Sequence, residues 1–257
     1  MKETRFFYVP DAAETTLLPD EEALHALKVL RLSTGDDIVL IDGCGHFYDA
    51  EVTATDKRHC HYSIKHVLPQ ERLWMPHLHI AVAPTKNIDR IEWFVEKAVE
   101  IGVDEITFLN CQFSERRNVR IDRIEKIVVA AMKQSRKAWK TQVNEMEDFD
   151  SFLSRVNDDN VDRFICHCYN EADISKAKQN AQINQENVIS VPDKPLLRDL
   201  IAKGRDTVVM VGPEGDFSID EVVRAEAMGS RPVSLGDSRL RTETAALVAV
   251  HLMRLFA

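Results

Sequence analysis

Residues 208–221 read VVMVGPEGDFSIDE, and this stretch contains one of the two strongest structural signals in the chain. The apolar run over 208–211 is typical of a buried strand, and the Gly/Pro-rich letters after it predict a loop. Ser218 and Glu221 have the spacing of a capping box, which satisfies the free N–H groups at the start of a helix. The stretch therefore predicts a strand, a tight loop and a helix that runs to about Gly229.

The same order of elements returns near the end of the chain. Pro232–Leu235 predicts a short strand, residues 236–241 (GDSRLR) a loop, and Thr242–Phe256 a helix. Loops at the carboxyl ends of neighbouring strands are where open α/β sheets bind ligands, and glycine lets a backbone approach a ligand closely. Neither loop has the letters of a P-loop or of the dinucleotide fingerprint. They are candidate ligand loops of another kind, or ordinary strand-to-helix turns.

The helix at 242–256 has little polar face, so it must be buried on most sides. Two arrangements satisfy this requirement. A second subunit supplies part of the burial in an isologous dimer, or the helix lies wholly inside its own domain.

Upstream of these loops, strands and helices alternate from His77 onward, which predicts an α/β domain with a mostly parallel sheet. Residues 171–187 are polar and rich in Gln and Asn, and predict an exposed helix or loop. The predicted strands are 78–83, 105–109, 163–168 and 207–211, and the predicted helices are 87–101 and 121–138.

The first seventy residues have a different pattern, with short β-rich runs joined by glycine turns. This pattern predicts a small barrel or meander, preceded by a short helix at about 20–31. Residues 68–72 have the composition of a linker. We therefore expect two domains, 1–72 and 73–257. The predicted strands of the first are 36–42, 46–55 and 61–68.

The composition of the 257 residues is that of a globular protein with a formal charge of −9. No apolar run is long enough to span a bilayer and no signal peptide is visible, so we expect a cytoplasmic protein without a membrane partner. Five cysteines are an odd, sparse set, which argues against a disulfide framework. Cys166-His167-Cys168 and His59-Cys60-His61 lack a second cysteine pair at zinc spacing, so we expect no metal and interpret these thiols as buried packing groups.

Positive charge gathers in one window, residues 116–140, which holds nine Lys or Arg against two acids. Such a window is either a solvated helix face or a surface that meets phosphates, with Trp139 available to stack on a base. The cations proposed for RNA are Arg116, Arg117, Arg120, Arg123, Lys133, Arg136, Lys137 and Lys140.

Taken together, motifs along nearly the whole chain resemble those of the RsmE family. The individual motifs are short, and their joint presence in the family order makes the resemblance specific. They are Gly212-Pro213-Glu214-Gly215 with Phe217-Ser218 and Glu221, Leu235-Gly236, Leu240-Arg241-Thr242-Glu243-Thr244-Ala245, His25–Arg31 with Gly35-Asp36, Lys97–Val103, Ser114-Glu115-Arg116 and Gln134-Ser135.

The resemblance implies an S-adenosylmethionine-dependent enzyme that methylates N3 of a uridine in 16S ribosomal RNA of the small subunit. It implies an α/β catalytic domain of the SPOUT superfamily with a C-terminal trefoil knot, preceded by a PUA-like β-barrel that contacts RNA. Members are typically homodimers. The implied partners are 16S ribosomal RNA or the small subunit and a second copy of the chain, and DNA is not among them.

The resemblance also assigns roles to residues. Arg241 would hold the target nucleotide or its developing anion, and Glu214 and Glu243 would remove its proton or orient Arg241; a structural role for either carboxylate is the alternative. His25, Lys28 and Arg31 in the N-terminal signature would contact RNA. The residues that would cradle the cofactor are Thr85, Val211, Gly212, Pro213, Glu214, Gly215, Leu235, Gly236 and Leu240.

The chain departs from the family pattern at three places. Asp216 stands where the family usually has glycine, Lys133 precedes Gln134 with Arg136 one position early, and the letters at 237–238 differ. Two other functions stay open at this point. A sister enzyme that methylates ribose 2′-OH is disfavoured by the letters at 240–244, and a non-catalytic ribosome-assembly factor is disfavoured by the glycine loops with Arg241.

Overall fold

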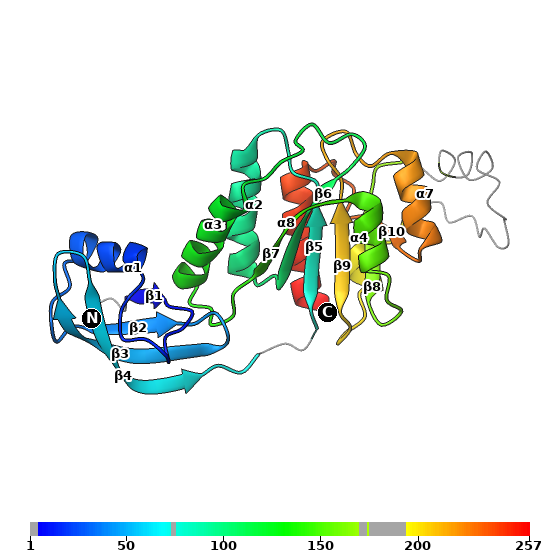
Figure 1. The fold of residues 1–257 in the computed structure, drawn as a ribbon. Coiled ribbons are helices and arrows are strands. Elements are labelled where there is room, and N and C mark those ends of the chain that lie inside the picture. Colours follow the sequence, from blue (N-terminus) through cyan, green and yellow to red (C-terminus); the bar gives the residue numbers. More distant parts are fainter. Residues whose placement is uncertain (1–4, 73–75, 170–173, 175–193) are drawn as a thin grey trace. The chain divides into compact units, whose positions relative to one another are not determined.

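The structure is a computed structural model that describes residues 5–72, 76–169, 174 and 194–257. The chain packs as two units, each with its own sheet (Figure 1). The first unit comprises Met1–Trp74 and Val128–Lys140, and the second comprises Met75–Ile127 and Thr141–Ala257. The first unit therefore includes a segment that lies far beyond the expected division at residue 72.

The sheet of the first unit has the order β1-β2-β3-β4. β1 pairs with β2 in parallel, and β2, β3 and β4 form an antiparallel meander. All three strands predicted for this region are confirmed, although β4 continues into the segment expected to be a linker. The strands are β1 (Phe6–Tyr8), β2 (Asp37–Ile41), β3 (His46–Thr55) and β4 (Cys60–Pro69).

The helix predicted at 20–31 is only partly correct. α1 (Asp20–Leu24) is α-helical, but the chain then widens into a π-helical turn, η1 (His25–Val29), in which the Leu30 N–H donates to the His25 carbonyl at 3.1 Å. Two apolar side chains of this segment, Leu24 and Val29, are exposed. Arg31 follows with a φ of 54°, which ends the helix.

The helix predicted at 121–138 also ends early. α3 (Ile121–Gln134) stops because Arg136 adopts a left-handed φ of 54°. The chain then brings the Trp139 ring onto Gly45, where a Cβ atom would lie 2.4 Å from the ring, and the Arg72 guanidinium lies over the ring at 5.3 Å. The Trp139 ring therefore packs within its own unit, and its stacking on a base stays a prediction.

The second unit contains a six-stranded sheet of order β10-β8-β9-β5-β6-β7 in which every pairing is parallel. This confirms the α/β prediction, while β7 was not predicted. Parallel pairing places the carboxyl ends of all these strands at one edge. The strands are β5 (Leu78–Val82), β6 (Glu105–Asn110), β7 (Gln142–Asp148), β8 (Asp162–Cys166), β9 (Thr207–Val211) and β10 (Arg231–Val233).

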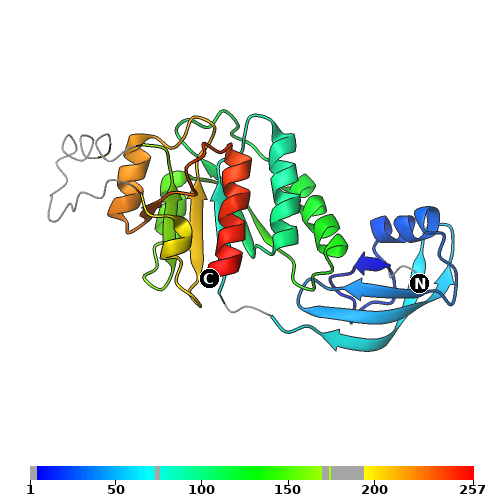
Figure 2. The same ribbon diagram turned by 180° about the vertical axis from the view of Figure 1, so that it is seen from behind.

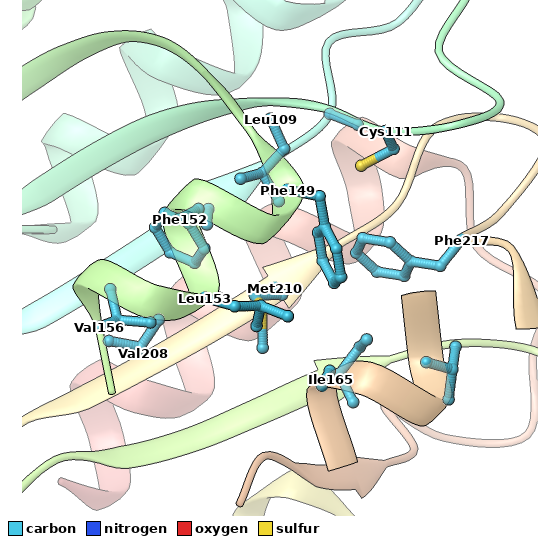
Figure 3. Close-up of a cluster of buried hydrophobic side chains, with 14 of the residues drawn as sticks. Leu109, Cys111, Phe149, Phe152, Leu153, Val156, Ile165, Val208, Met210 and Phe217 are labelled. Carbon is cyan, nitrogen blue, oxygen red and sulfur yellow. The ribbon is translucent and has the colours of Figure 1, made fainter. Parts of the chain in front are cut away.

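Helices cover both faces of this sheet. α2 (Ile88–Ile101) and α8 (Thr242–Phe256) pack together on one face (Figure 2), and α4 (Phe149–Arg155) and α7 (Ile219–Ala227) cover the other, with the short α6 (Leu197–Leu200) beside α8. Figure 3 shows the core under α4 and α7, where the rings of Phe149 and Phe217 meet at 5.2 Å. α4 was not predicted, and the polar segment 171–187 lies, apart from residue 174, outside the described residues.

The helix termini follow the sequence signals closely. Asn87 caps α2, Gly102 ends it with a φ of 111°, and Ser218 with Glu221 forms the predicted capping box at α7. α8 buries one face and leaves Leu255 and Phe256 exposed, so it does not lie wholly inside its own domain, and burial by a second subunit stays a prediction. Among the described residues, no helix is long and apolar enough to cross a membrane.

Polar side chains near the amino ends of β5 and β6, in the sheet of the second unit, form a network. His79 is 3% exposed, its Nε2 lies 2.8 Å from Thr107 Oγ1, and its ring meets the Phe152 ring edge-on. Burial lowers the pKa of His79 to about 4, because the charged imidazole would lose its hydration. Glu105 lies 3.5 Å from the same ring and bonds His77, whose pKa it raises.

His79 should make the unfolding free energy depend on pH between its unfolded pKa of 6.5 and its folded pKa of about 4. Below pH 6.5 the histidine of the unfolded chain binds a proton, whereas the buried ring of the folded chain stays neutral. The free energy of unfolding therefore falls as the pH falls through this window, by about 3 kcal/mol at its lower end. Urea unfolding of the second unit between pH 7.5 and 4.5 measures this slope.

His79→Gln should flatten the slope, and His66→Gln, which changes an exposed histidine, should leave it as in the unmodified chain. The pH dependence contributed by His77 and Glu105 differs from that of His79. The raised pKa of His77 gives stability that is lost as the pH rises, and the lowered pKa of Glu105 acts only below its unfolded value of 4.5. Equal slopes in both variants would contradict the assignment to His79.

Candidate functional site

Five loops follow the carboxyl ends of the parallel strands of the second unit. They comprise residues 83–87 after β5, 111–117 after β6, 167–169 after β8, 212–218 after β9 and 234–241 after β10. In open α/β sheets this is the edge at which ligands bind. The two loops predicted from sequence, 212–217 and 236–241, therefore lie at the same edge as three others.

The Glu221 carboxylate ties two of these loops together. Its Oε2 accepts from the Ser218 N–H at 2.7 Å, as the capping box requires, and its Oε1 accepts from the Gln112 N–H at 2.8 Å. Glu221 is 2% exposed, so these bonds are shielded from water. The loop after β6 is consequently held against the start of α7 and the loop before it.

The loop at 212–217 is a tight turn that doubles back on itself. A Cβ atom on Gly212 would lie 2.8 Å from the Phe217 nitrogen, so only glycine fits, and the Asp216 N–H donates to the Pro213 carbonyl at 2.9 Å. Phe217 anchors the end of the loop in the core (Figure 3). Glu214 and Gly215, at the tip of the turn, are exposed.

Asp216, which departs from the family pattern, has a structural reason in this chain. Its φ is 68°, a left-handed value that aspartate tolerates better than most residues. Its carboxylate accepts from the Phe217 N–H at 2.8 Å and from the Cys168 N–H at 2.7 Å. The side chain thus bonds the loop after β9 to the loop after β8.

The loop after β8 takes part in the site, which the sequence did not predict. The Tyr169 hydroxyl donates to the Phe217 carbonyl at 2.8 Å, and the Lys194 ammonium donates to the carbonyls of His167 and Tyr169. Burial lowers the pKa of Lys194, and burial beside this ammonium lowers the pKa of His167 to about 3. His167 is therefore neutral, and its buried Nε2 has no hydrogen-bond partner within the described part of the chain.

The second predicted loop begins at Ser234. Its hydroxyl donates to the Gly236 carbonyl, and Gly236 has a φ of 127° with open space where a Cβ atom would be. Leu235 and Leu240 are half-buried, and Arg241 is exposed as the N-cap residue of α8. The loop therefore offers free backbone, two apolar side chains and the exposed guanidinium groups of Arg239 and Arg241.

Glu214 connects the turn at 212–217 with the loop after β5, and Arg116 connects the loop after β6 with the same loop. Glu214 Oε1 accepts from the Lys86 N–H at 2.9 Å, and Arg116 donates to the Thr85 carbonyl at 3.1 Å and to the Lys86 carbonyl. Thr85 is fully buried, and its hydroxyl donates to the Asn87 carbonyl. Thr85 thus stabilises the loop after β5 through a hydrogen bond within it, while Glu214 is exposed at the site.

Glu243 is placed differently from Glu214. It is 6% exposed in the first turn of α8, and its Oε1 lies 3.8 Å from the Arg90 Nε on α2. Its Oε2 has no hydrogen-bond partner among the residues the structure describes. The structure therefore turns this carboxylate toward α2, where it makes a buried contact with Arg90.

Several cations predicted to meet RNA already have acidic or aromatic partners. Arg120 pairs with Asp122 at 2.9 Å, Arg123 with Glu92 at 2.6 Å and Lys133 with Glu22. The window is also divided between the units, since residues 128–140 belong to the first. Arg117 bonds Asn110 at 3.5 Å, Arg136 lies over the Phe6 ring, and Lys137 and Lys140 have partners of their own.

In the first unit, the three signature residues proposed for RNA lie on one short segment of the chain. His25, Lys28 and Arg31 are all exposed on η1 and the residues after it, at a spacing of three. The His25 ring also meets the Phe7 ring edge-on at 6.4 Å, which fixes it on the sheet.

The cysteine and histidine clusters behave only partly as expected. Cys60 is buried, but Cys168 is exposed and Cys166 is half-buried, so the interpretation of 166–168 as two buried thiols is wrong. The exposure follows from the strand end, because β8 stops at Cys166. Within the described residues, no group of three or more His, Cys, Asp or Glu side chains is arranged to hold a metal ion.

Comparison with known proteins identifies both parts of the chain. Residues 73–254 match the model of the RNA methyltransferase domain family, and residues 18–65 match the RNA methyltransferase PUA domain. A curated relative, the ribosomal RNA small subunit methyltransferase E of Rickettsia conorii, is 26% identical over 99% of this chain and 96% of its own length.

Solved structures agree with these matches. A probable rRNA-methyltransferase from Porphyromonas gingivalis is 37% identical, with a TM-score of 0.83 over 98% of each chain. The ribosomal RNA small subunit methyltransferase E from Neisseria gonorrhoeae, solved bound to S-adenosyl methionine, is 26% identical with a TM-score of 0.81, again over 98% of each chain.

Replacing Asp216 by alanine should release the loop after β8. The carboxylate bond to the Cys168 N–H is lost and alanine disfavours the left-handed φ, so hydrogen exchange of the Cys168 amide should accelerate about 5- to 150-fold, as a loss of 1–3 kcal/mol implies. Hydrogen–deuterium exchange measured by mass spectrometry checks this. Asp220→Ala removes a nearby exposed carboxylate and serves as the control. Unchanged exchange at Cys168 in Asp216→Ala would refute the role of the side chain.

Proposed function

The chain belongs to the RsmE family of RNA methyltransferases, and on that premise we propose that it transfers a methyl group from S-adenosylmethionine to N3 of a uridine in 16S ribosomal RNA. The observation that carries the proposal is the joining of the loops after β8 and β9 at one edge, next to the loop that ends at the exposed Arg241. Residues 73–257 would carry out the chemistry and residues 1–72 would contact RNA.

The residues at this edge fit the proposed cofactor. Exposed backbone at Gly215 and Gly236 offers amide and carbonyl groups, and the half-buried Leu235 and Leu240 offer apolar surface for an adenine ring. The unpartnered Nε2 of neutral His167 offers one more polar contact beside the loop 212–217. Val211, Gly212 and Pro213 are buried and shape the turn, and Thr85 supports the neighbouring loop from below.

The chemistry that such a cofactor supplies is an electrophilic methyl group on a sulfonium. Uridine N3 carries a proton at neutral pH and is a poor nucleophile until this proton leaves. Arg241 is exposed and cationic, so it can stabilise the uridine anion as it forms. The C–S bond breaks as the N–C bond forms, and the proton passes to a base or to water.

Of the two carboxylates proposed for proton removal, the structure favours Glu214. Glu214 is exposed at the turn and held by the Lys86 N–H, so a nucleotide can reach it. Glu243 is buried against Arg90, so we assign it to positioning the start of α8.

The RNA surface is proposed to include the exposed cations of both units. His25, Lys28 and Arg31 contribute from the first unit. Arg116 and Arg117 flank the site in the second, and the remaining cations of the window (Arg120, Arg123, Lys133, Arg136, Lys137 and Lys140) must exchange or share their present partners to bind phosphate.

We further propose a C-terminal trefoil knot and a homodimer in the cytoplasm, where ribosomal RNA is found. The return of the chain after β10 to pack α8 on β5, β9 and α2 supports the knot. The exposed Leu255 and Phe256, beside the half-buried Val248 and Leu252 on α8, support the dimer, because a second copy would cover this apolar surface.

The function is tested with small ribosomal subunits that lack the modification. Incubation with the chain and labelled S-adenosylmethionine, followed by digestion to nucleosides and mass spectrometry, should yield labelled 3-methyluridine. Arg241→Ala should lose at least about 100-fold in rate, because an electrostatic contact to the developing anion is removed. Its affinity for the cofactor, measured by calorimetry, should stay the same.

Arg239→Ala removes the same charge from the same exposed loop and should retain activity. A labelled 2′-O-methyl nucleoside would show the sister activity instead. Absence of cofactor binding by the unmodified chain would show a non-catalytic RNA-binding factor. Full activity of Arg241→Ala would remove this residue from the mechanism.

A further inference from the structure

Phe113 is an exposed aromatic side chain at the edge where the candidate site lies. It belongs to the loop after β6, and 45% of its surface is open to solvent. Burying a phenylalanine side chain is worth about 1.5–3 kcal/mol, so an aromatic ring left open beside a ligand site calls for an explanation. Neither the cofactor residues nor the proposed acid–base groups include it.

The backbone that carries Phe113 is fixed on both sides of the ring. Cys111 and Ser114 exchange two hydrogen bonds, from the Ser114 N–H to the Cys111 carbonyl at 3.1 Å and from the Cys111 N–H to Ser114 Oγ at 3.0 Å. The Gln112 N–H donates to buried Glu221, and the Cys111 side chain is in the core (Figure 3). The exposure of Phe113 is therefore not that of a loose loop, because its neighbours are held in place.

Phe113 lies directly against the turn at 212–217. A Cβ atom on Gly215 would come 3.2 Å from Phe113 Cβ and 3.8 Å from its Cγ. Glycine at 215 thus lets the two loops touch, and the aromatic residue borders the turn whose tip carries Glu214.

Cations accompany the ring. Arg116, three residues further on, is half-buried and anchored by the carbonyls of Thr85 and Lys86, and Arg117, the next residue, is exposed. An exposed aromatic ring with arginines nearby in the chain is a combination by which proteins bind single-stranded nucleic acid, because a ring stacks on a base while cations meet phosphates.

We propose that Phe113 stacks on a nucleobase of the single-stranded RNA segment that carries the target uridine, and so positions this segment at the site. The inference rests on the proposed function and adds to it the residue that binds the RNA base. The competing role is purely structural, with the ring acting as a cover over Gly215. Replacing the ring by an apolar chain separates the two roles, because leucine and methionine cover the loop but offer no flat π face.

The experiment compares Phe113→Leu, Phe113→Met, Phe113→Tyr and Phe113→Trp. Stacking of one base contributes about 1–3 kcal/mol, so Leu and Met should lower kcat/KM for unmodified small subunits about 5- to 150-fold, and Tyr and Trp should restore it to within about threefold. Binding of the same subunits, measured by filter retention, should weaken for Leu and Met in parallel. Calorimetric affinity for S-adenosylmethionine should be unchanged in all four variants.

Trp93→Leu provides a matched control. Trp93 is also 45% exposed, but it lies on α2, away from the loops after β6 and β9 along the chain. It should keep full activity. Wild-type activity in Phe113→Leu, or a loss that Tyr and Trp do not repair, or a loss that follows cofactor affinity, would overturn the proposal. Failure of the unmodified chain to methylate RNA would instead overturn the proposed function.

Discussion

The buried carboxylate of Glu221 is the interaction on which the candidate site depends. One oxygen completes the capping box at the start of α7, and the other accepts from the Gln112 N–H in the loop after β6. A buried carboxylate that accepts from backbone N–H groups is strongly bound, because its partners replace the water that it has lost. It therefore holds the turn at 212–217 and the loop at 111–117 at a fixed separation, and with them the exposed Glu214 and Phe113. Asp216 joins the turn at 212–217 to the loop after β8 in a similar way, because its carboxylate accepts from the Cys168 N–H.

Elements with a strong local pattern could be predicted from the sequence. β9, α7 and α8 follow from an apolar run, a capping box and a long apolar helix, and α2 from its periodicity and Gly102. β7 gives no such signal, because Gln142–Asp148 is an edge strand with half-exposed positions and acidic side chains. η1 was missed because the widening from α- to π-helix changes the hydrogen bonds and not the residue types.

The site shows a similar division. The glycine loops and Arg241 could be recognised from the sequence, and the structure brings the turn at 212–217 to the same edge of the sheet as 234–241. The opposite environments of Glu214 and Glu243 could not be predicted, because burial against Arg90 depends on the packing of α8 on α2. The part played by the loop after β8 could not be predicted either, because it depends on tertiary contacts. His167, Tyr169 and Lys194 matter through hydrogen bonds to backbone atoms, which residue types do not encode.

We expect the loops 212–217 and 234–241 to enclose a methyl donor beside Arg241. A crystal structure of the chain with S-adenosylmethionine would show whether they do. The expected arrangement has the adenine between Leu235 and Leu240, polar contacts to the backbone at Gly215 and Gly236, and the methyl group facing the side of the site where Arg241 is exposed. Density for the cofactor at another edge of the sheet, with these two loops closed on each other, would contradict it.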